Sequence, residues 1–441
     1  MTKEEICKQF DVKIFTDNIE DSAVEQIATL MAQDVFSQSK VRIMPDVHAG
    51  AGCVIGFTGD LGERVIPNIV GVDIGCGMLI TPFTVNRDID YHALQLFIDS
   101  HIPSGRDVRQ PDKFAPLNPK HMEMYCEAKE LVKPIRCYRE LKECKRIYKG
   151  IGTLGGGNHF IEIDRDAQGK YYLVLHTGSR NLGKQVAEIY QKTAIKNQSG
   201  WDELMEVQNR MIADYKAAGR RSELQEAVAK LHSTFVMRKS KVPRELCYVE
   251  GQSREDYLHD MRICQRWATI NRRLISSLIT DFLTSEFGAV IDEAGTFESV
   301  HNYIGDDNII RKGAISAREG ERCIIPLNMR DGSLICRGKG NPDWNYSAPH
   351  GAGRVLSRAQ AFKQIALADF QQSMQGIYSE TVVESTKDEA PMVYKPADEI
   401  IRNIQGTVAI ENIIKPVFNF KAARRGEAAN DADPDPDTDA D

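Results

Sequence analysis

The sequence predicts a single large α+β domain of mixed sheets with flanking helices and a helical insertion. Its 441 residues are 42% hydrophobic, which is enough to bury a large core. Glycine-rich segments with strand-like apolar runs alternate with a block, about residues 184–287, where glycine is scarce and apolar residues recur every three or four positions. No internal repeat and no linker is seen within residues 1–421, so one domain is favoured. Two domains divided near residue 185 are the alternative.

Each predicted element follows from its own pattern. Strands joined by functional loops are expected in "VRIMPDVHAGAGCVIGF" (41–57), "YYLVLHTGSRNLG" (171–183) and "RCIIPLNMRDGSLICRG" (322–338), and a strand after a tight turn is one interpretation of "HFIEI" (159–163). Helices are expected in "ELMEVQNRMIADYKAA" (203–218) and "CQRWATINRRLISSLITDFL" (264–283). Loops at the strand ends are then the places for function.

The charge is concentrated at the C-terminal end of the chain. Residues 422–441 carry seven acidic and two basic side chains, a net of −5 out of −7, so residues 1–421 carry only −2. We expect this acidic Asp/Pro/Ala tail to be disordered, because it has little apolar surface to bury. No apolar run reaches the ~18 residues that a membrane helix needs, and no secretory signal is seen, so a cytoplasmic protein without a membrane partner is expected.

Histidines and cysteines suggest a metal site. The ten cysteines show no C-x-x-C spacing, which argues against a zinc ribbon. Five of the ten histidines stand in stretches dense in Gly, Asn, Ser or Pro, and we interpret these stretches as loops. Histidines held on loops at strand ends are how metal sites are commonly built. The five are His48, His159, His176, His301 and His350.

A carboxylate and a thiol join the histidines in "VGVDIGCGM". Asp73 and Cys76 are three residues apart, so a turn or a first helical turn brings both side chains to one point. Hard and soft donors together suit Mn²⁺, Zn²⁺ or Fe²⁺ better than Mg²⁺ or Ca²⁺. The alternative for Cys76 is a small buried apolar side chain.

Two glycine-rich segments surround single histidines. In "GTLGGGNHFIEI" (152–163) the glycines indicate that something bulky approaches the backbone beside His159. In "SAPHGAGR" (347–354) small residues and Arg354 suit a polyphosphate, and a neutral imidazole can attack phosphorus. His350 is therefore a candidate nucleotidyl carrier, and a sixth metal ligand is the alternative.

These motifs together resemble the RtcB family of RNA ligases. The matching blocks run in family order through "MPDVHAGAG", "VGVDIGCGM", "GTLGGGNHFIEI", "LHTGSRNLG", "DYLHDMRICQRWATINR", "HNYI", "RKGAI", "HGAGR", "YKP" and "FNFK". They cover nearly the whole chain up to Lys421 and leave out only the acidic tail.

The resemblance implies a GTP-dependent ligase that joins RNA 3′-phosphate (or 2′,3′-cyclic phosphate) ends to 5′-hydroxyl ends in tRNA splicing or RNA repair. His350 would attack the α-phosphate of GTP, and the GMP would pass to the RNA 3′-phosphate before the 5′-hydroxyl displaces it. Two Mn²⁺ ions per subunit are implied, with Cys76 as the bridging ligand. The implied metal ligands are Asp73, Cys76, His159, His176 and His301.

The resemblance also implies contacts to the substrates. Residues matching guanylate-binding positions are Asn158, His159, Phe160, Ile161, Glu162, His301, Asn302, Pro326, Leu327, Asn328, Met329, Ser333, His350, Gly351, Ala352, Gly353 and Lys421. Candidate RNA or phosphate contacts are Asp46, His48, Arg180 and Arg354. Well-studied members carry a "PGSMG"-like loop where this chain has "PLNMRDGS", so the nucleotide preference at Leu327 and Asn328 stays open.

Other partners and functions stay open as well. "KELVKPIRCYRELKECKRIYKG", residues 129–150, has eight basic and three acidic residues and is the candidate RNA-binding surface, with a solvated charged face as the alternative. A helper protein that promotes guanylation is a further expected partner. The rival functions are a binuclear metal phosphatase or phosphodiesterase without covalent guanylate, and an RNA-binding subunit without chemistry.

Overall fold

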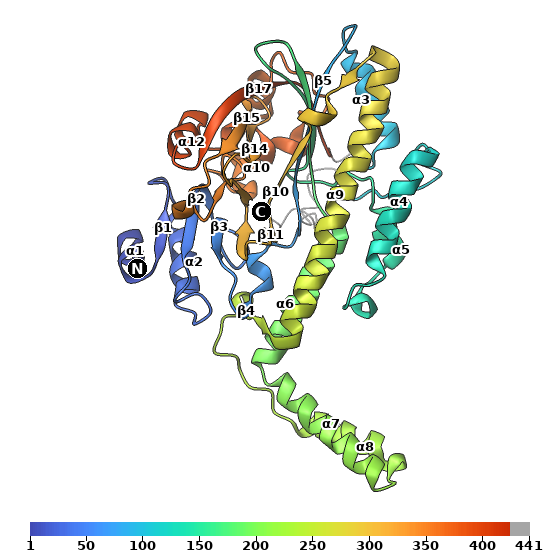
Figure 1. The fold of residues 1–441 in the computed structure, drawn as a ribbon, viewed down its shortest axis with the longest axis vertical. Coiled ribbons are helices and arrows are strands. Elements are labelled where there is room, and N and C mark those ends of the chain that lie inside the picture. Colours follow the sequence, from blue (N-terminus) through green and yellow to red (C-terminus); the bar gives the residue numbers. More distant parts are fainter. Residues whose placement is uncertain (424–441) are drawn as a thin grey trace.

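The chain folds around two sheets, one antiparallel and one mixed, seen in a computed structural model that describes residues 1–423 (Figure 1). The predicted class, α+β with mixed sheets and flanking helices, is confirmed. The acidic tail, residues 422–441 in the sequence interpretation, lies outside the described residues from 424 onward.

The larger sheet carries most of the site. All of its strand pairs are antiparallel, and β9 pairs with β5 beside the main order. The four predicted strand regions are confirmed. Three of them form β6, β7 and the β14–β15 hairpin of this sheet, and the fourth forms β2 and β3 of the second sheet. In spatial order the strands are β10 (Phe297–Val300), β5 (Gly77–Thr84), β7 (Tyr171–Thr177), β6 (Phe160–Arg165), β17 (Val408–Lys421), β15 (Gly332–Gly338) and β14 (Arg322–Asn328), with β9 (Val290–Ile291).

The second sheet brings the N-terminal region to the same site. Its order is β1 (Val12–Ile14), β2 (Val41–His48), β3 (Ile55–Asp60), β12 (Ile309–Lys312) and β11 (Tyr303–Ile304), with only β1 and β2 parallel. Two short pairs complete the strands: β13 (Ala314–Ser316) with β16 (Ser347–Pro349), and β4 (Arg64–Val65) with β8 (Val249–Glu250).

One helix, α9 (Gly251–Phe287), runs through the core and contacts β5 and β7. It packs between α6 (Arg180–Gln198) and α4 (Pro119–Val132), as Figure 1 shows. Its eighteen buried residues include Trp267 and Arg272, both fully buried. The second half of the predicted helical block is therefore a structural centre of the molecule.

The first half of that block forms an arm. Helices α7 (Trp201–Ala217) and α8 (Leu224–Thr234) pack on each other and project from the molecule (Figure 1). The helical run starts at Arg180, four residues before the predicted position, and residues 235–250 contain only one 3₁₀ turn and β8. The assignment of 184–287 as an insertion stays a prediction.

The remaining helices are shorter or less central to the site. They are α1 (Lys3–Gln9), α2 (Asp21–Met31), α3 (Tyr91–His101), α5 (Cys144–Lys149), α10 (Arg358–Gln364), whose first residue lines the pocket described below, α11 (Leu367–Ser373) and α12 (Ala397–Asn403). Within residues 1–423, none of the helices has the length and apolar character to span a bilayer.

Candidate active site

Neighbouring strands bring the predicted metal ligands together. Asp73 and Cys76 lie in a turn before β5, as predicted, and His159 directly precedes β6. In the sheet register, His176 of β7 lies opposite both Met78 of β5 and Phe160 of β6. His301 follows β10, which pairs with β5, and its N–H donates to the carbonyl of Cys76 at 2.8 Å. All five side chains therefore lie at the same end of the neighbouring strands β5, β6, β7 and β10.

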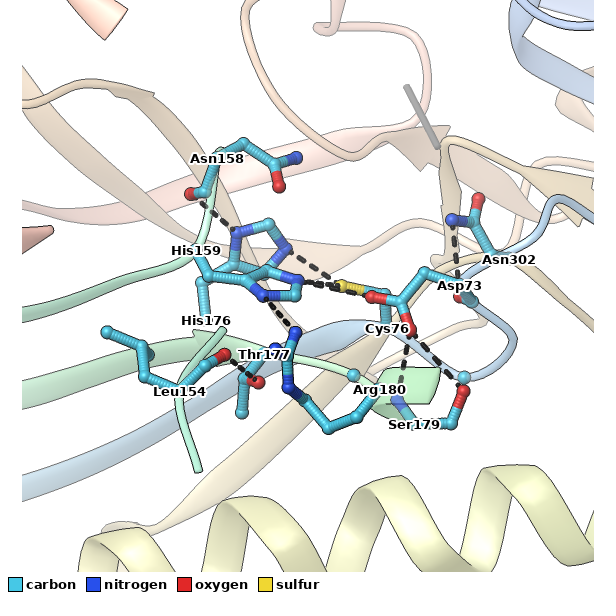
Figure 2. A network of polar contacts seen from close by, with 12 residues as sticks. Asp73, Cys76, Leu154, Asn158, His159, His176, Thr177, Ser179, Arg180 and Asn302 are labelled. Carbon is cyan, nitrogen blue, oxygen red and sulfur yellow. Dashed lines mark hydrogen bonds and ion pairs between the residues drawn. The ribbon is translucent and has the colours of Figure 1, made fainter. Parts of the chain in front are cut away.

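Their donor atoms form two groups that share one sulfur. Figure 2 shows Cys76 with Asp73, His159 and His176 around it. Cys76 Sγ lies 3.4 Å from His159 Nε2 and 3.3 Å from His176 Nε2. On one side His159 Nε2 lies 3.1 Å from Asp73 Oδ2, and on the other the Nε2 atoms of His176 and His301 are 3.1 Å apart. The groups Asp73–Cys76–His159 and Cys76–His176–His301 each have donor atoms within 4.8 Å of one another.

The chemistry of this donor set fits metal ions. The Nε2 atoms of His176 and His301 face each other beside the Cys76 thiol, and hydrogen bonds among these three atoms leave lone pairs unused that a cation would use. Desolvation by burial lowers the pKa of His176 and of His301 well below the usual value, which keeps both imidazoles neutral and able to bind metal. A thiolate at the shared position suits a bridge between two transition-metal ions.

Asp73 is held as a carboxylate. Burial raises its pKa, but hydrogen bonding and charge from His159, together with Arg180, outweigh burial and lower the pKa to about 2. Its Oδ1 accepts hydrogen bonds from the Ser179 N–H at 3.0 Å and the Ser179 hydroxyl at 3.3 Å (Figure 2). Ser179 caps the N-terminus of α6, whose dipole favours a negative charge there.

Glycine residues let these side chains come this close. A Cβ on Gly178 would overlap the Asp73 carboxylate, and a Cβ on Gly155, which has φ +91°, would overlap the Arg180 guanidinium. Arg180 itself has φ +58° and is nearly buried, with Nη1 3.3 Å from His159 Nδ1. At Gly155 the bulky group that approaches the backbone beside His159 is therefore the Arg180 guanidinium.

The sequence analysis places five histidines in loops, and the structure corrects this for two of them, which lie in strands. His176 is in β7 and His48 is the last residue of β2. The strands extend further than the Gly-rich flanks suggest because cross-strand pairing continues to the histidines, at Met78↔His176 and His48↔Ile55. His159, His301 and His350 do lie outside strands.

His350 follows β16 and is held by a buried carboxylate of β2. Its Nδ1 lies 2.7 Å from Asp46 Oδ2, and its backbone N–H donates to the same oxygen at 3.1 Å. Asp46 is fully buried and His350 is largely buried. The His350 ring lies 4.6 Å from the His301 ring, between centroids. With Nδ1–H donated to Asp46, the tautomer leaves Nε2 as the unprotonated nitrogen.

A pocket opens beside His350 and the metal group. Apolar side chains and a few polar groups line it, as is typical of sites for small molecules. Its walls come from β6, β7, β14, β15, β17 and the loop after β16. The predicted site residues that line it are His48, Asn158, Phe160, Glu162, His176, His301, Pro326, Leu327, Asn328, Met329, Ser333, His350, Gly351, Ala352, Gly353, Arg354 and Lys421.

Several predicted contacts do not line this pocket. The Ile161 side chain is fully buried in the main core, because side chains alternate along β6 and only Phe160 and Glu162 point to the pocket side. Asn302 accepts the Gly313 N–H at 2.8 Å and donates to the Asp73 carbonyl at 3.5 Å. Asp46 lies behind His350. His159, a member of the metal group, and Arg180, which contacts His159, do not line the pocket.

Sequence reasoning missed part of the pocket wall. Met78, Arg358, Glu389 and Tyr394 also line it. Glu389 is the centre of a buried network: it accepts from Lys421 Nζ at 2.9 Å, from the Tyr394 hydroxyl at 2.7 Å, and from Arg354 at 3.3 Å and Arg358 at 2.8 Å. The "YKP" and "HGAGR" blocks already hold Tyr394 and Arg354, but only the fold reveals Glu389 between them.

Two acidic side chains lie along β6 behind the pocket. Burial raises the pKa of Glu162 to about 7, although Asn419, which donates to Oε1 at 2.6 Å, and Lys421 act to lower it. Burial and the neighbouring Glu162 raise the pKa of Asp164 well above its usual value. Glu162 therefore presents a carboxyl group to the pocket that titrates near neutral pH.

The basic segment 129–150 lies on the surface. It spans the end of α4, a 3₁₀ turn and α5, and all eight of its Lys and Arg residues are exposed. Its last residue, Gly150, leads directly into the segment 151–159 that ends at His159. The basic segment is therefore followed directly in the sequence by the segment that carries His159.

Comparison with known proteins gives one consistent match. Residues 24–422 match the model of the family described as tRNA-splicing ligase RtcB. The chain is 31% identical to the RNA-splicing ligase RtcB of Escherichia coli K12, over 93% of this chain and 97% of that protein. It is also 25% identical to a tRNA-splicing ligase RtcB of Pyrobaculum aerophilum and 26% identical to one of Archaeoglobus fulgidus, which cover 90% and 87% of this chain and 91% and 87% of those proteins.

Proposed function

The chain belongs to the RtcB family of tRNA-splicing ligases, and on this premise we propose that it joins RNA 3′-phosphate or 2′,3′-cyclic phosphate ends to 5′-hydroxyl ends, using GTP. Family membership supports a ligase over a binuclear phosphatase or phosphodiesterase. Two kinds of histidine environment support this mechanism: four donor side chains surround Cys76, while His350, outside both donor groups, is hydrogen-bonded to Asp46.

His350 is the nucleophile of the first step. Asp46 accepts its Nδ1–H, which fixes the ring and leaves the Nε2 lone pair to attack the α-phosphate of GTP. The P–N bond forms as the bond to pyrophosphate breaks, and the product is a histidine–GMP intermediate. Asp46 also stabilises the positive charge that develops on the imidazole during attack.

The pocket beside His350 holds the guanylate. Gly351, Ala352 and Gly353 allow phosphates to approach the backbone, and Arg354 supplies positive charge. Glu162 and Lys421 line the pocket and offer an acceptor and a donor, which suits the N1–H and O6 of a guanine base. Leu327 and Asn328 add one apolar and one amide contact at the departure from the "PGSMG"-like loop.

Asp73, Cys76, His159, His176 and His301 are the residues that would hold two Mn²⁺ ions, since their donor atoms form two groups with Cys76 in common. Metal ions held there would supply positive charge to the attacking and leaving oxygens. GMP then passes from His350 to the RNA 3′-phosphate and forms an anhydride. The RNA 5′-hydroxyl attacks this activated phosphorus, and GMP leaves as the phosphodiester closes.

The exposed segment 129–150 binds the RNA backbone. The chain has a net charge of −7, so it needs a local basic surface to attract phosphates, and this segment carries a net of +5. The physiological RNA, whether transfer RNA, ribosomal RNA or damaged RNA in general, is not specified by these contacts.

Labelled GTP tests the proposal. Incubation with Mn²⁺ and α-labelled GTP should attach label to the wild-type protein, and the label should be acid-labile and base-stable as a phosphoramidate. His350→Ala should bind metal normally, form no labelled protein, and still seal RNA whose 3′-phosphate already carries guanylate. His176→Ala should fail in both reactions, because each displacement needs the ions.

Two results would reject these roles. Phosphate release from RNA ends without any labelled protein would indicate the phosphatase. Loss of metal in His350→Ala, or equal failure of both variants on guanylated RNA while metal is retained, would show that His350 is not a nucleotidyl carrier distinct from the metal ligands.

A further inference from the structure

Two adjacent buried residues of α9, Asn271 and Arg272, lie directly behind the metal group. Both are fully buried, and Arg272 is among the largest fully buried side chains of residues 1–423. Neither touches the donor atoms of the site, and neither lines the pocket. A buried guanidinium and a buried amide are costly unless their hydrogen bonds are satisfied, so their partners indicate their role.

Asn271 ties two metal-site segments together. Its Oδ1 accepts the N–H groups of Gly152 at 2.7 Å and Thr153 at 3.2 Å, in the segment that leads to His159. Its Nδ2 donates to the carbonyls of Thr153 at 3.1 Å and Gly178 at 3.2 Å. One amide thus fixes the backbone before His159 and the backbone after His176.

Arg272 ties the remaining segments. Its Nη1 donates to the Gly75 carbonyl at 2.9 Å, next to Cys76, and to the Thr177 carbonyl at 2.8 Å, next to His176. Its Nε lies 3.4 Å from Oε1 of Glu298, a residue of β10 three positions before His301. The guanidinium therefore connects the segments that carry Cys76, His176 and His301.

We infer that Asn271 and Arg272 are positioning residues that hold the two-metal centre in its ligand geometry before metal binds. The five ligands come from segments far apart in the sequence, and these two side chains contact the backbone beside them or the strand that leads to them. Gly178 extends the connection to Asp73, because the next residue, Ser179, donates its N–H to that carboxylate. Removing either side chain frees segments whose relative position sets the spacing of the donor atoms.

Metal binding and cobalt absorption test this inference, which rests on the proposed two-metal centre. Asn271→Asp keeps an acceptor for the Gly152 and Thr153 N–H groups but loses the donors to Thr153 and Gly178. Arg272→Lys keeps the charge but has no Nε or Nη2, so it loses the contacts to Glu298 and Thr269. Partners behind metal ligands typically contribute 10–100-fold to affinity, so each variant should bind Mn²⁺ about 10–100-fold more weakly in equilibrium dialysis. With Co²⁺, the thiolate charge-transfer band from Cys76 should shift or weaken, which a purely structural role would not cause.

The same helix provides a matched control. Asp260 is fully buried and accepts the N–H groups of Arg136 at 2.8 Å and Cys137 at 3.1 Å, in a segment without metal ligands. It lies three turns before Asn271, about 16 Å along the helix axis. Asp260→Asn should lower the melting temperature without changing Mn²⁺ affinity or the cobalt spectrum.

The outcomes separate the inference from the proposed function. Folded Asn271→Asp and Arg272→Lys proteins that bind two Mn²⁺ as tightly as wild type would overturn the inference and leave the ligase proposal intact. Equal weakening by Asp260→Asn would also overturn it, because the effect would then be general loss of α9 stability. Wild-type protein that binds no Mn²⁺ would instead reject the metal centre itself. Two variants at separate residues keep the test decisive if one fails to fold.

Discussion

The pair formed by His350 and Asp46 shows how one contact assigns a chemical role. Two hydrogen-bonding groups of His350, Nδ1 and the backbone N–H, converge on the same carboxylate oxygen. This arrangement orients the imidazole and selects one tautomer. A histidine whose ring rotates freely has neither a fixed orientation nor a fixed tautomer. A ligand histidine needs only a lone pair, whereas a nucleophile that acquires positive charge gains from a buried carboxylate behind it.

We therefore expect Asp46→Asn to slow guanylation of His350. An amide is neutral and donates as well as accepts, so it stabilises the charged imidazole less and permits the other tautomer. The rate of labelled-protein formation in a single turnover should fall by about 10²–10⁴-fold. Mn²⁺ binding should be unchanged, because Asp46 is not in the metal group. A rate within twofold of wild type would show that Asp46 has no role in activating His350.

Glu162 should make the stability of the metal-free protein depend on pH. Burial raises its pKa in the folded state to about 7 from an ordinary value of 4.5, so the folded protein binds this proton more tightly than the unfolded chain. Stability from this group is then complete below about pH 4.5 and is lost as the pH rises to about 7, by roughly 1.4 kcal/mol per pKa unit.

Glu162→Gln removes that titration. In EDTA, the difference in melting temperature between Glu162→Gln and wild type should be more positive at pH 8 than at pH 5. The reason is that the variant has no buried carboxyl group to ionise. The exposed Glu286→Gln serves as the control and should give the same difference from wild type at both pH values. A constant or shrinking difference for Glu162→Gln would contradict the raised pKa.

At the residue scale, many residues of the candidate site could be recognised from the sequence alone. Asp73, Cys76 and the histidines stand out because rare residue types occur beside glycines, and the order of the blocks identifies a family. Glu389 gave no such signal, since it becomes important only when Lys421, Tyr394, Arg354 and Arg358 fold around it. Asn271 and Arg272 look like ordinary helix residues for the same reason.

At the element scale, local patterns predict element types better than their ends or partners. Apolar runs identified β6, β7 and the β14–β15 hairpin, because such runs reflect burial in a sheet. The pattern could not predict that β17 would lie between β6 and β15, which joins residues at least 70 positions apart. It also could not separate the buried helix α9 from the arm, because both alternate apolar and charged residues.

The arm formed by α7 and α8 should be dispensable for the chemistry at His350. The Arg238 N–H donates to the Ser199 carbonyl at 2.9 Å, so the two ends of the arm lie side by side. No residue of α8 is buried. Replacing residues 200–237 with a short glycine linker should leave Mn²⁺ binding and guanylation within about twofold of wild type, because such exposed excursions tolerate change.

Circular dichroism and the labelled-GTP assay check the excision. One cooperative melting transition with normal guanylation is the expected result. A folded protein that has lost guanylation would show that the arm contributes to the pocket or to the metal centre.

At the scale of the whole molecule, the site uses residues from Asp46 to Lys421, so it exists only when the two sheets are assembled. β2 supplies the carboxylate behind His350, β5, β6, β7 and β10 lead to the metal ligands, and β17 ends at Lys421 in the pocket. Ligand positions therefore depend on long-range pairing, and this is why α9, which contacts several of these segments, matters beyond its own stability.

The acidic tail and the residue just before it should behave in opposite ways. Lys421 Nζ donates to Glu389 at 2.9 Å and to the Asn158 carbonyl at 3.2 Å, so Lys421→Met leaves a buried carboxylate short of a cation and should abolish guanylation. Deleting residues 422–441 begins one position later and should leave guanylation unchanged.

The deletion also changes the net charge from −7 to −2, which weakens the repulsion of RNA. The truncated protein should bind RNA more tightly than the full chain at 50 mM salt, and this advantage should vanish near 500 mM because screening shortens the reach of the tail's charge. Fluorescence anisotropy with a labelled RNA at both salt concentrations measures the effect. If deletion abolished guanylation as Lys421→Met does, the tail would belong to the catalytic unit and could not be an appendage, whatever its effect on RNA affinity.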